Sequence, residues 1–392
     1  MKTVDVLIIG AGHAGVECAM ALRAGGFAGT IALLSDENAL PYERPPLSKG
    51  FLAGTTDSER LHLRAEKVFA DQGIELVLGT RVARLDAQQR HAVAESGATI
   101  AFGHCVIATG AGARALPPLQ GEAVFSIRTL ADTQALRGRL APGSRLLVVG
   151  GGYLGLEAAC TAAKMGADVS VLEQGPSIMP GRVSDHTARN LTDLHREHGV
   201  RIHTGCRIGR WERDGAVWRA HGADGEMHEA ELVLVAIGAQ PNIALAEAAG
   251  VACDGGILVD QECRTSAPGI FAIGDCAAAR RPETGLAMRV ESVNNALVQA
   301  RIVAAVLAGK PVAPYRPPTF WSEQCGKRLQ MAGLAAPGKA IEDQVKTTAR
   351  GWLVERYQEG ILRAVEAVDS PAEFMQGLKR IGSPQQPTTV QQ

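Results

Sequence analysis

Two glycine-rich segments, 10–15 and 150–155, have the residue spacing that cradles a phosphate. They read Gly-Ala-Gly-His-Ala-Gly and Gly-Gly-Gly-Tyr-Leu-Gly. In such a turn the first glycine makes the bend, the second lets a pyrophosphate approach the backbone, and the third lets helix and strand pack closely. The following helix offers unpaired N–H groups to the phosphate. The glycines expected at the two phosphates are Gly10, Gly12, Gly15, Gly150, Gly152 and Gly155.

A carboxylate follows each glycine turn, at the end of the next apolar run. Asp36 comes 26 residues after Gly10, and Glu173 comes 23 residues after Gly150. This spacing is typical of the acid that binds the adenosine ribose of a dinucleotide. A carboxylate there repels a 2′-phosphate, and no Lys or Arg lies at 174–181 to bind one. The second site is therefore predicted to take NADH in preference to NADPH.

The elements that position these residues repeat along the chain. Each glycine turn lies between a short apolar run and a stretch rich in helix formers, and a second apolar run follows. This is the strand–turn–helix–strand order of a Rossmann unit, and it predicts an α/β fold with two dinucleotide-binding units. The expected elements are strands at 4–9 and 31–34 around a helix at 16–23, and strands at 146–149 and 169–172 around a helix at 156–165.

Composition and charge argue against several other classes of protein. The formal net charge of −1 gives no sign of a nucleic-acid binder. The short apolar start contains Asp5 and is not a signal peptide, and the absence of a run of 18 uncharged apolar residues predicts no membrane span. The eight cysteines form no C-x-x-C and no metal-ligand cluster, so we expect reduced, mostly structural thiols in a cytoplasmic protein and no bound metal.

Two Rossmann units suggest a flavin and a nicotinamide, which together make a hydride relay. The segment 270–276, Ile-Phe-Ala-Ile-Gly-Asp-Cys, resembles the second FAD motif of the two-dinucleotide flavoprotein reductases shaped like glutathione reductase. That resemblance places Gly274 and Asp275 at the flavin ribityl chain. Segments 107–110 and 236–238 resemble the crossing segments between the domains of that family.

Three further segments, 42–49, 289–296 and 320–324, resemble the ferredoxin reductases of bacterial oxygenase systems. They read Tyr-Glu-Arg-Pro-Pro-Leu-Ser-Lys, Arg-Val-Glu-Ser-Val-Asn-Asn-Ala and Phe-Trp-Ser-Glu-Gln. With the first glycine turn, this resemblance assigns FAD to Gly10, Gly12, Ala14, Gly15, Asp36, Arg44, Lys49, Val82, Arg128, Gly274, Asp275, Val293 and Trp321. With the second turn, it assigns NADH to Gly150, Gly152, Gly155, Glu173 and Gly238.

Four residues, of which Glu291 is assigned to neither cofactor, have alternative interpretations. Lys49 either lies near flavin N5, where a cation steadies the reduced ring, or is a surface lysine. Arg128 either contacts FAD or caps a helix. Glu291 either bounds the nicotinamide pocket or pairs with Lys49. Lys49 and Glu291 are the two candidate catalytic residues. Trp321 either stacks near the flavin or packs in a core.

The cysteine positions argue against a thiol in catalysis. Relatives that reduce disulfides or peroxides carry a cysteine beside the flavin, and residues 36–50 contain none. Cys325, just after the Trp-Ser-Glu-Gln segment, departs from the family pattern, and we expect it to be a small apolar filler.

The resemblance implies a chain that passes electrons from NADH through FAD to a [2Fe–2S] ferredoxin serving an oxygenase or a cytochrome P450. The alternatives are an NADH reductase for rubredoxin, quinone or oxygen, and a redox-gated signalling flavoprotein. Five cations are candidates for docking an acidic ferredoxin: Arg280, Arg281, Arg289, Lys327 and Arg328. The expected domains are an FAD domain at 1–110 and 236–315, an NADH domain at 111–235, and a C-terminal α+β domain at 316–392 whose tail from Ser383 is disordered.

Overall fold

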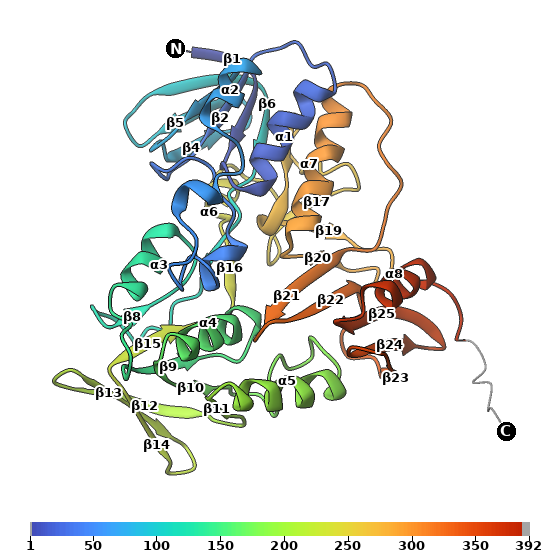
Figure 1. Ribbon diagram of the computed structural model, residues 1–392. Coiled ribbons are helices and arrows are strands. Elements are labelled where there is room, and N and C mark those ends of the chain that lie inside the picture. Colours follow the sequence, from blue (N-terminus) through green and yellow to red (C-terminus); the bar gives the residue numbers. More distant parts are fainter. Residues whose placement is uncertain (1, 386–392) are drawn as a thin grey trace. The chain divides into compact units, whose positions relative to one another are not determined.

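The computed structural model describes residues 2–385, which divide into two compact units (Figure 1). Each unit is assembled from three separate stretches of the chain. The first unit contains the described residues of Met1–Glu43, Glu59–Gly112 and Gln240–Pro318. The second contains those of Arg44–Ser58, Ala113–Ala239 and Thr319–Gln392.

The first unit is built on a sheet of strand order β3-β2-β1-β6-β5-β4, with β18 pairing to β6. Its neighbours β3, β2, β1, β6 and β18 pair in parallel, whereas β4 and β5 are antiparallel. The strands are β1 Lys2–Ile9, β2 Ile31–Leu34, β3 Ile74–Val77, β4 Val82–Asp86, β5 His91–Ala94, β6 Thr99–Ile107 and β18 Ile270–Ala272.

Helices α1 (His13–Ala24) and α7 (Val293–Leu307) pack side by side in this unit (Figure 1). Val6 and Leu7 of β1 are fully buried although they point to opposite faces, because the parallel sheet is covered on both sides. The remaining elements are α2 Glu66–Asp71, α6 Ala244–Ala248, η3 Gly274–Cys276, and a small sheet of β17 Ile257–Val259, β19 Ala277–Arg280 and β20 Ala287–Arg289. Three elements lie where the chain passes between units: η2 Ser58–Leu61, and the paired strands β7 Ala111–Ala113 and β16 Ala239–Pro241.

The second unit repeats the design with a parallel sheet of order β11-β10-β9-β15-β8. An antiparallel sheet of β12, β13 and β14 adjoins it. The elements are η1 Pro45–Ser48, β8 Val124–Phe125, α3 Leu130–Arg137, β9 Arg145–Val149, α4 Tyr153–Lys164, β10 Asp168–Leu172, α5 Asp185–Glu197, β11 Val200–His203, β12 Ile208–Asp214, β13 Val217–Gly222, β14 Met227–Ala230 and β15 Leu232–Val235.

The end of the chain adds an antiparallel sheet of order β21-β22-β25-β24-β23 to the second unit. Helix α8 covers this sheet, and Phe374 packs there against Val365 and Leu362. The elements are β21 Thr319–Gln324, β22 Lys327–Gly333, β23 Glu342–Thr347, β24 Trp352–Gln358, β25 Ile361–Val368 and α8 Pro371–Arg380.

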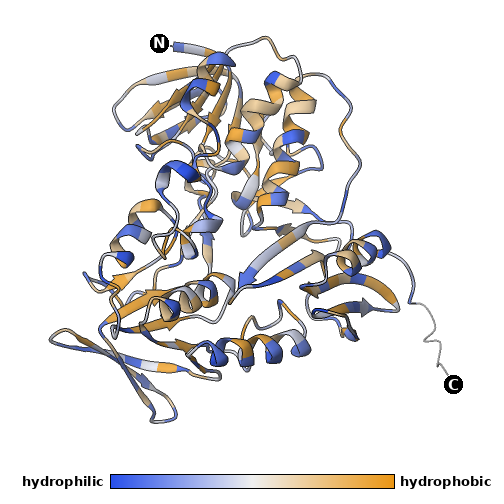
Figure 2. Cartoon of the chain, in the orientation of Figure 1, coloured by the Kyte–Doolittle hydropathy of each residue, from blue (hydrophilic) through white to orange (hydrophobic). Residues whose placement is uncertain are grey.

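The α/β class with two Rossmann-type units and an α+β end is confirmed. The parallel strands of both units contain many hydrophobic residues in Figure 2, as their burial requires. The expected disordered tail is wrong for its first residues, because Pro384 bridges to Ile361 and the Gln385 N–H bonds Gly360. The rest of that prediction, 386–392, lies outside the described residues. Within residues 2–385, no helix is long and apolar enough to cross a membrane.

Candidate functional site

The first glycine turn has the geometry that a bound pyrophosphate needs. Gly10 has a φ of 108°, and a Cβ there would overlap the backbone oxygen of Ala108. A Cβ on Gly15 would overlap the oxygen of Gly10, so α1 packs directly on the turn. At Gly12, by contrast, no described atom lies within 4 Å of the Cβ position. Open space therefore lies at the N-terminus of α1, and these residues fit a dinucleotide phosphate.

The second turn repeats this geometry. Gly150 has a φ of 109°, and a Cβ there would be 2.5 Å from the backbone oxygen of Ala236. Gly155 packs on the oxygen of Gly150, and Gly152 again faces open space within the described chain. Gly238, with a φ of 109°, lies two residues beyond Ala236 and also leaves its Cβ position free of described atoms. The second unit thus fits a second dinucleotide.

The two ribose-binding candidates are placed differently. Glu173 directly follows β10, and its carboxylate accepts hydrogen bonds from the N–H groups of Gly151, at 2.8 Å, and Gly175, at 2.6 Å. The backbone therefore holds this carboxylate beside the glycine turn. Asp36 follows β2 after the buried Ser35 and is exposed. Both positions are suited to hydrogen bonding a ribose.

The second flavin motif lies against the first. Gly274 begins η3 with a φ of 77°, and its Cβ position is 3.1 Å from the Cβ of Ala14. Asp275 follows in η3, while Val293 opens α7 after the N-cap Ser292. The structure thus brings the starts of α1, η3 and α7 together in the first unit.

Val82, the first residue of β4, lies near the expected ribose acid. The turn before it is bound to the segment of Asp36, because the N–H of Thr80 donates to the oxygen of Ser35 at 2.7 Å. The N–H of Gly79 donates to Glu37 in the same way, at 3.1 Å. Val82 therefore begins β4 two residues after a turn that is hydrogen bonded to the segment of Asp36.

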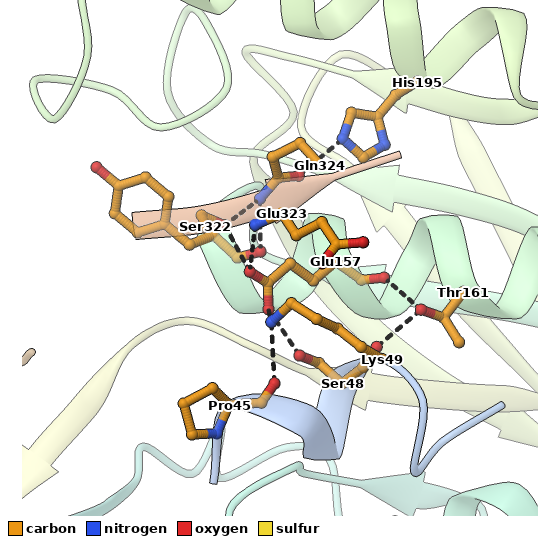
Figure 3. A network of polar contacts seen from close by, with 10 residues as sticks. Pro45, Ser48, Lys49, Glu157, Thr161, His195, Ser322, Glu323 and Gln324 are labelled. Carbon is orange, nitrogen blue, oxygen red and sulfur yellow. Dashed lines mark hydrogen bonds and ion pairs between the residues drawn. The ribbon is translucent and has the colours of Figure 1, made fainter. Parts of the chain in front are cut away.

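Lys49 is part of a polar network in the second unit (Figure 3). Its ammonium lies 2.6 Å from Oε2 of Glu157 on α4 and donates to the oxygen of Pro45 at 2.9 Å. The Glu157 carboxylate also accepts from the hydroxyls of Ser48, at 2.6 Å, and Ser322, at 2.5 Å. The Lys49 side chain is 18% exposed and that of Glu157 is 9% exposed. The surface-lysine alternative is therefore wrong.

Trp321 lies beside this network. It is 41% exposed, which excludes a place in a packed core. The Lys49 ammonium lies 5.4 Å from its ring centroid, and the guanidinium of Arg328 lies 5.7 Å from it. An exposed indole between two cations offers an aromatic surface of the kind that stacks on another ring.

Arg44 and Arg128 meet in the second unit. The Arg44 guanidinium donates to the backbone oxygen of Arg128 at 2.5 Å. Helix α3 is capped by Thr129 and Asp132, which form a reciprocal capping box. The helix-cap interpretation of the Arg128 side chain is therefore wrong.

Glu291 pairs with Arg289 at 2.6 Å, whereas Lys49 pairs with Glu157. Each of these two residues thus has a partner of opposite charge within its own unit. Glu157 is a residue that sequence reasoning missed. Its signal was a single acid inside the apolar helix that follows the second glycine turn, since a charge buried in such a helix needs partners.

The five docking candidates are not equivalent. Arg281 is 5% exposed and bonds Asn295, so it is a core residue. Arg289 is neutralised by Glu291, and Lys327 pairs with Asp369 at 2.9 Å. Arg280 and Arg328 are exposed, and within residues 2–385 neither forms an ion pair with a carboxylate. The prediction that all five residues form one basic docking surface is therefore wrong.

The expectation that the cysteines are reduced thiols is wrong for one pair. Cys160 of α4 and Cys325 form a disulfide in the second unit, although they are 165 residues apart. His195 joins them in a group whose atoms could also hold a metal, as do His203, Glu226 and His228 elsewhere in this unit. No short-range spacing reveals such groups, because each assembles only when strands and helices pack. Cys325 is accordingly not a filler.

Two glycine turns that fit dinucleotides, with an acid after each, define a two-dinucleotide oxidoreductase. The chain belongs to the pyridine nucleotide-disulphide oxidoreductase family, whose pattern matches residues 4–300, and the reductase C-terminal family matches residues 319–391. It is thus an FAD-dependent flavoprotein that uses NAD(H).

Curated relatives span nearly the whole chain. It is 38% identical to the 5,5′-dehydrodivanillate O-demethylase ferredoxin reductase subunit of Sphingobium sp., over 96% of this chain and 93% of that protein. It is 36% identical to putidaredoxin reductase of Pseudomonas putida, over 95% and 90%.

Solved structures agree with this relationship. The crystal structure of the covalent putidaredoxin reductase–putidaredoxin complex matches with a TM-score of 0.92 and 35% identity, covering 98% of this chain and 95% of that one. The ferredoxin reductase for the CYP199A2 system of Rhodopseudomonas palustris matches with a TM-score of 0.90 and 39% identity, covering 96% and 93%. The first of these reductases is thus seen in complex with putidaredoxin, and the second is named for the CYP199A2 system.

Proposed function

We propose that this chain transfers electrons from NADH through FAD to a [2Fe–2S] ferredoxin that serves an oxygenase or a cytochrome P450. The observation that carries the proposal is the pair of dinucleotide turns in a chain without a cysteine at 36–50. With no thiol there to accept electrons, they leave the flavin for an external partner. The names of the relatives indicate what that partner is.

When bound, FAD accepts a hydride from NADH and releases electrons singly. In the first unit, we propose that Gly10, Gly12 and Gly15 hold the FAD pyrophosphate and that Asp36 holds its ribose. Open space at Gly12 and the absence of a side-chain cap at this N-cap residue support this assignment. The remaining proposed FAD contacts of this unit are Ala14, Val82, Gly274, Asp275 and Val293.

In the second unit, Gly150, Gly152 and Gly155 hold the NADH pyrophosphate in this proposal. Glu173 orients the adenosine ribose, because its carboxylate is fixed at the turn by two N–H groups. Gly238 leaves room beside this turn.

Four other residues of the second unit, Arg44, Lys49, Arg128 and Trp321, are assigned to FAD by resemblance. Glu157 holds the Lys49 ammonium in one place, so this cation is pre-positioned for charge that develops on a bound ring. Glu291 is proposed to bound the nicotinamide pocket, held by Arg289. We place the reaction in the cytoplasm, where NADH is the common reductant.

The proposal is tested by turnover of the purified, FAD-loaded protein with NADH and a [2Fe–2S] ferredoxin such as putidaredoxin. We expect the ferredoxin to be reduced at least tenfold faster than oxygen or a quinone. Faster reduction of a quinone would favour the small-acceptor alternative. Slow turnover with every acceptor would favour a signalling role.

A further inference from the structure

The disulfide of Cys160 and Cys325 joins two distant elements within the second unit. Cys160 lies in α4, three residues after Glu157, and is 3% exposed. Cys325 lies at the turn between β21 and β22 and is 9% exposed. Their Cα atoms are 5.7 Å apart, within the range of a disulfide. The other six cysteines, all in the part of the chain that the structure describes, are free.

A buried histidine lies against this pair. His195 of α5 is fully buried, and its Nδ1 is 3.4 Å from Sγ of Cys325. Its Nε2 is 2.9 Å from Oε1 of Gln324 (Figure 3). The Gln324 amide nitrogen donates to Ser322 and to the oxygen of Tyr153, so the amide oxygen faces His195.

This arrangement fixes the tautomer of His195. Because the Gln324 oxygen can only accept, Nε2 of His195 carries the proton and Nδ1 presents a lone pair to Cys325. The Nδ1 lone pair can therefore accept a hydrogen bond from a reduced Cys325 thiol and orient its sulfur.

The backbone of Cys325 is a second, independent observation. Its φ is +49° and that of Gly326 is +88°, so both central residues of the two-residue hairpin turn are left-handed. Such turns favour Asn-Gly, because the left-handed backbone is unfavourable for most residues with a side chain. A cysteine is thus held at a position that favours another residue, and this position brings its sulfur to Cys160.

We propose that Cys160 and Cys325 form a reversible thiol–disulfide site that hydroperoxides oxidise, with Cys325 as the attacking thiol and His195 as the acceptor that orients its S–H. The Cys325 sulfur attacks the peroxide O–O bond, and the thiol proton passes to the departing oxygen. This step gives the Cys325 sulfenic acid and one water when the peroxide is hydrogen peroxide.

The Cys160 thiol then attacks the sulfenic sulfur and releases a second water, leaving the disulfide. The two thiols have lost two electrons, and the peroxide has gained them. Two equivalents of a small thiol restore the pair by exchange through a mixed disulfide. The site differs from a flavin-edge dithiol because it lies on α4 and the β21–β22 turn.

The redox state of the pair bears directly on the Lys49 network. Ser322 and Gln324, which precede Cys325, are hydrogen bonded to each other, and Ser322 bonds Glu157. Glu157 and Cys160 share one face of α4, three residues apart. The disulfide therefore clamps β21 to the helix that carries the Lys49 counter-ion.

The test uses the FAD-loaded protein, reduced with dithiothreitol, desalted, and treated with a few equivalents of hydrogen peroxide. Alkylation and peptide mapping should then show two of the eight thiols lost, one cross-linked peptide containing Cys160 and Cys325, and recovery of both thiols with dithiothreitol. Cys253→Ser, at a free and half-buried cysteine, is the control and should cross-link normally.

Single variants identify the attacking thiol. In Cys160→Ser, dimedone should trap a sulfenic acid at Cys325, whereas Cys325→Ser should give at least tenfold less trapping at Cys160. His195→Gln should slow oxidation at least tenfold. The trapping ratio decides the attacking thiol even if the histidine variant does not fold.

Three results would overturn the proposal. The first is that Cys160 and Cys325 both alkylate fully after peroxide. The second is equal trapping at the two cysteines in the single variants. The third is one tightly bound Zn²⁺ per chain that is lost in Cys160→Ser, because two metal-held thiolates would replace the disulfide.

Discussion

Glu157 and Lys49 form an ion pair at 2.6 Å in which the carboxylate is also bonded by Ser48 and Ser322. Such a charge is stable in a buried place only because every lone pair has a partner. Glu157→Gln keeps the shape and removes the charge. We expect about 2 kcal/mol lower stability and at least tenfold slower reduction of the flavin by NADH.

Stopped-flow absorbance and thermal unfolding of the FAD-loaded protein measure these effects. Glu231→Gln is the matched control, because Glu231 forms a surface pair with Arg145 and is 43% exposed. A surface pair is worth about 0–1 kcal/mol, so this variant should resemble the wild type. Equal behaviour of both variants would contradict the role of Glu157.

Substitutions at Gly12 and Gly152 should weaken the binding of FAD and of NADH, respectively, without affecting the other cofactor. Each Cβ position faces open space in the described chain, so Gly12→Val and Gly152→Val should fold. Gly12→Val should lower the FAD content of the purified protein. Gly152→Val should keep FAD and raise the KM for NADH at least tenfold. Each variant is the control of the other, and loss of FAD from both would show that the assignment is wrong.

Glu173 should set the preference for NADH. The wild type should prefer NADH to NADPH at least tenfold in kcat/KM, which needs only about 1.4 kcal/mol. Glu173→Ala combined with Gln174→Arg should shrink or reverse the ratio, because a cation then replaces the anion at the 2′ position. Asp168→Ala, at the other end of β10, should leave the ratio unchanged. An unselective wild type would refute this prediction.

Arg328 should act in the encounter with ferredoxin. Because surface charges attract over roughly a Debye length of 8–10 Å, Arg328→Glu should slow ferredoxin reduction three- to tenfold at low salt. The reduction of flavin by NADH should not change. Arg139→Glu is an exposed charge reversal on α3's C-terminal side and serves as control. Equal slowing by both variants would show that Arg328 has no specific role in docking.

His195 should make the protein sensitive to acid. Burial lowers the pKa of His195 from 6.5 to about 4 in the folded protein, so the unfolded chain binds the proton more tightly. Stability is complete above pH 6.5 and falls as the pH drops toward 4, by roughly 3 kcal/mol in all. Urea unfolding from pH 7 to pH 4 should show a smaller loss in His195→Gln than in the exposed control His198→Gln. Parallel curves would contradict this assignment.

Local spacing made the glycine turns predictable, because turn, helix start and strand end are all set within about 25 residues. The partner of Lys49 was not predictable, since Glu157 is 108 residues away and approaches only after folding. The same reason hid the pairing of Cys160 with Cys325. The burial of Arg281 was hidden too, because exposure depends on packing and not on the charge of a residue.

The interleaving of the two units has a consequence for synthesis on the ribosome. Lys49 leaves the ribosome 108 residues before Glu157, which is roughly 5–20 s at the usual rate of elongation. Ser322 follows Glu157 by a further 165 residues. The first unit has all its segments by Pro318, whereas the second then still lacks β21–β25. The Lys49 network is therefore completed only late in synthesis, and a nascent chain that stalls before Thr319 carries an incompletely bonded Glu157.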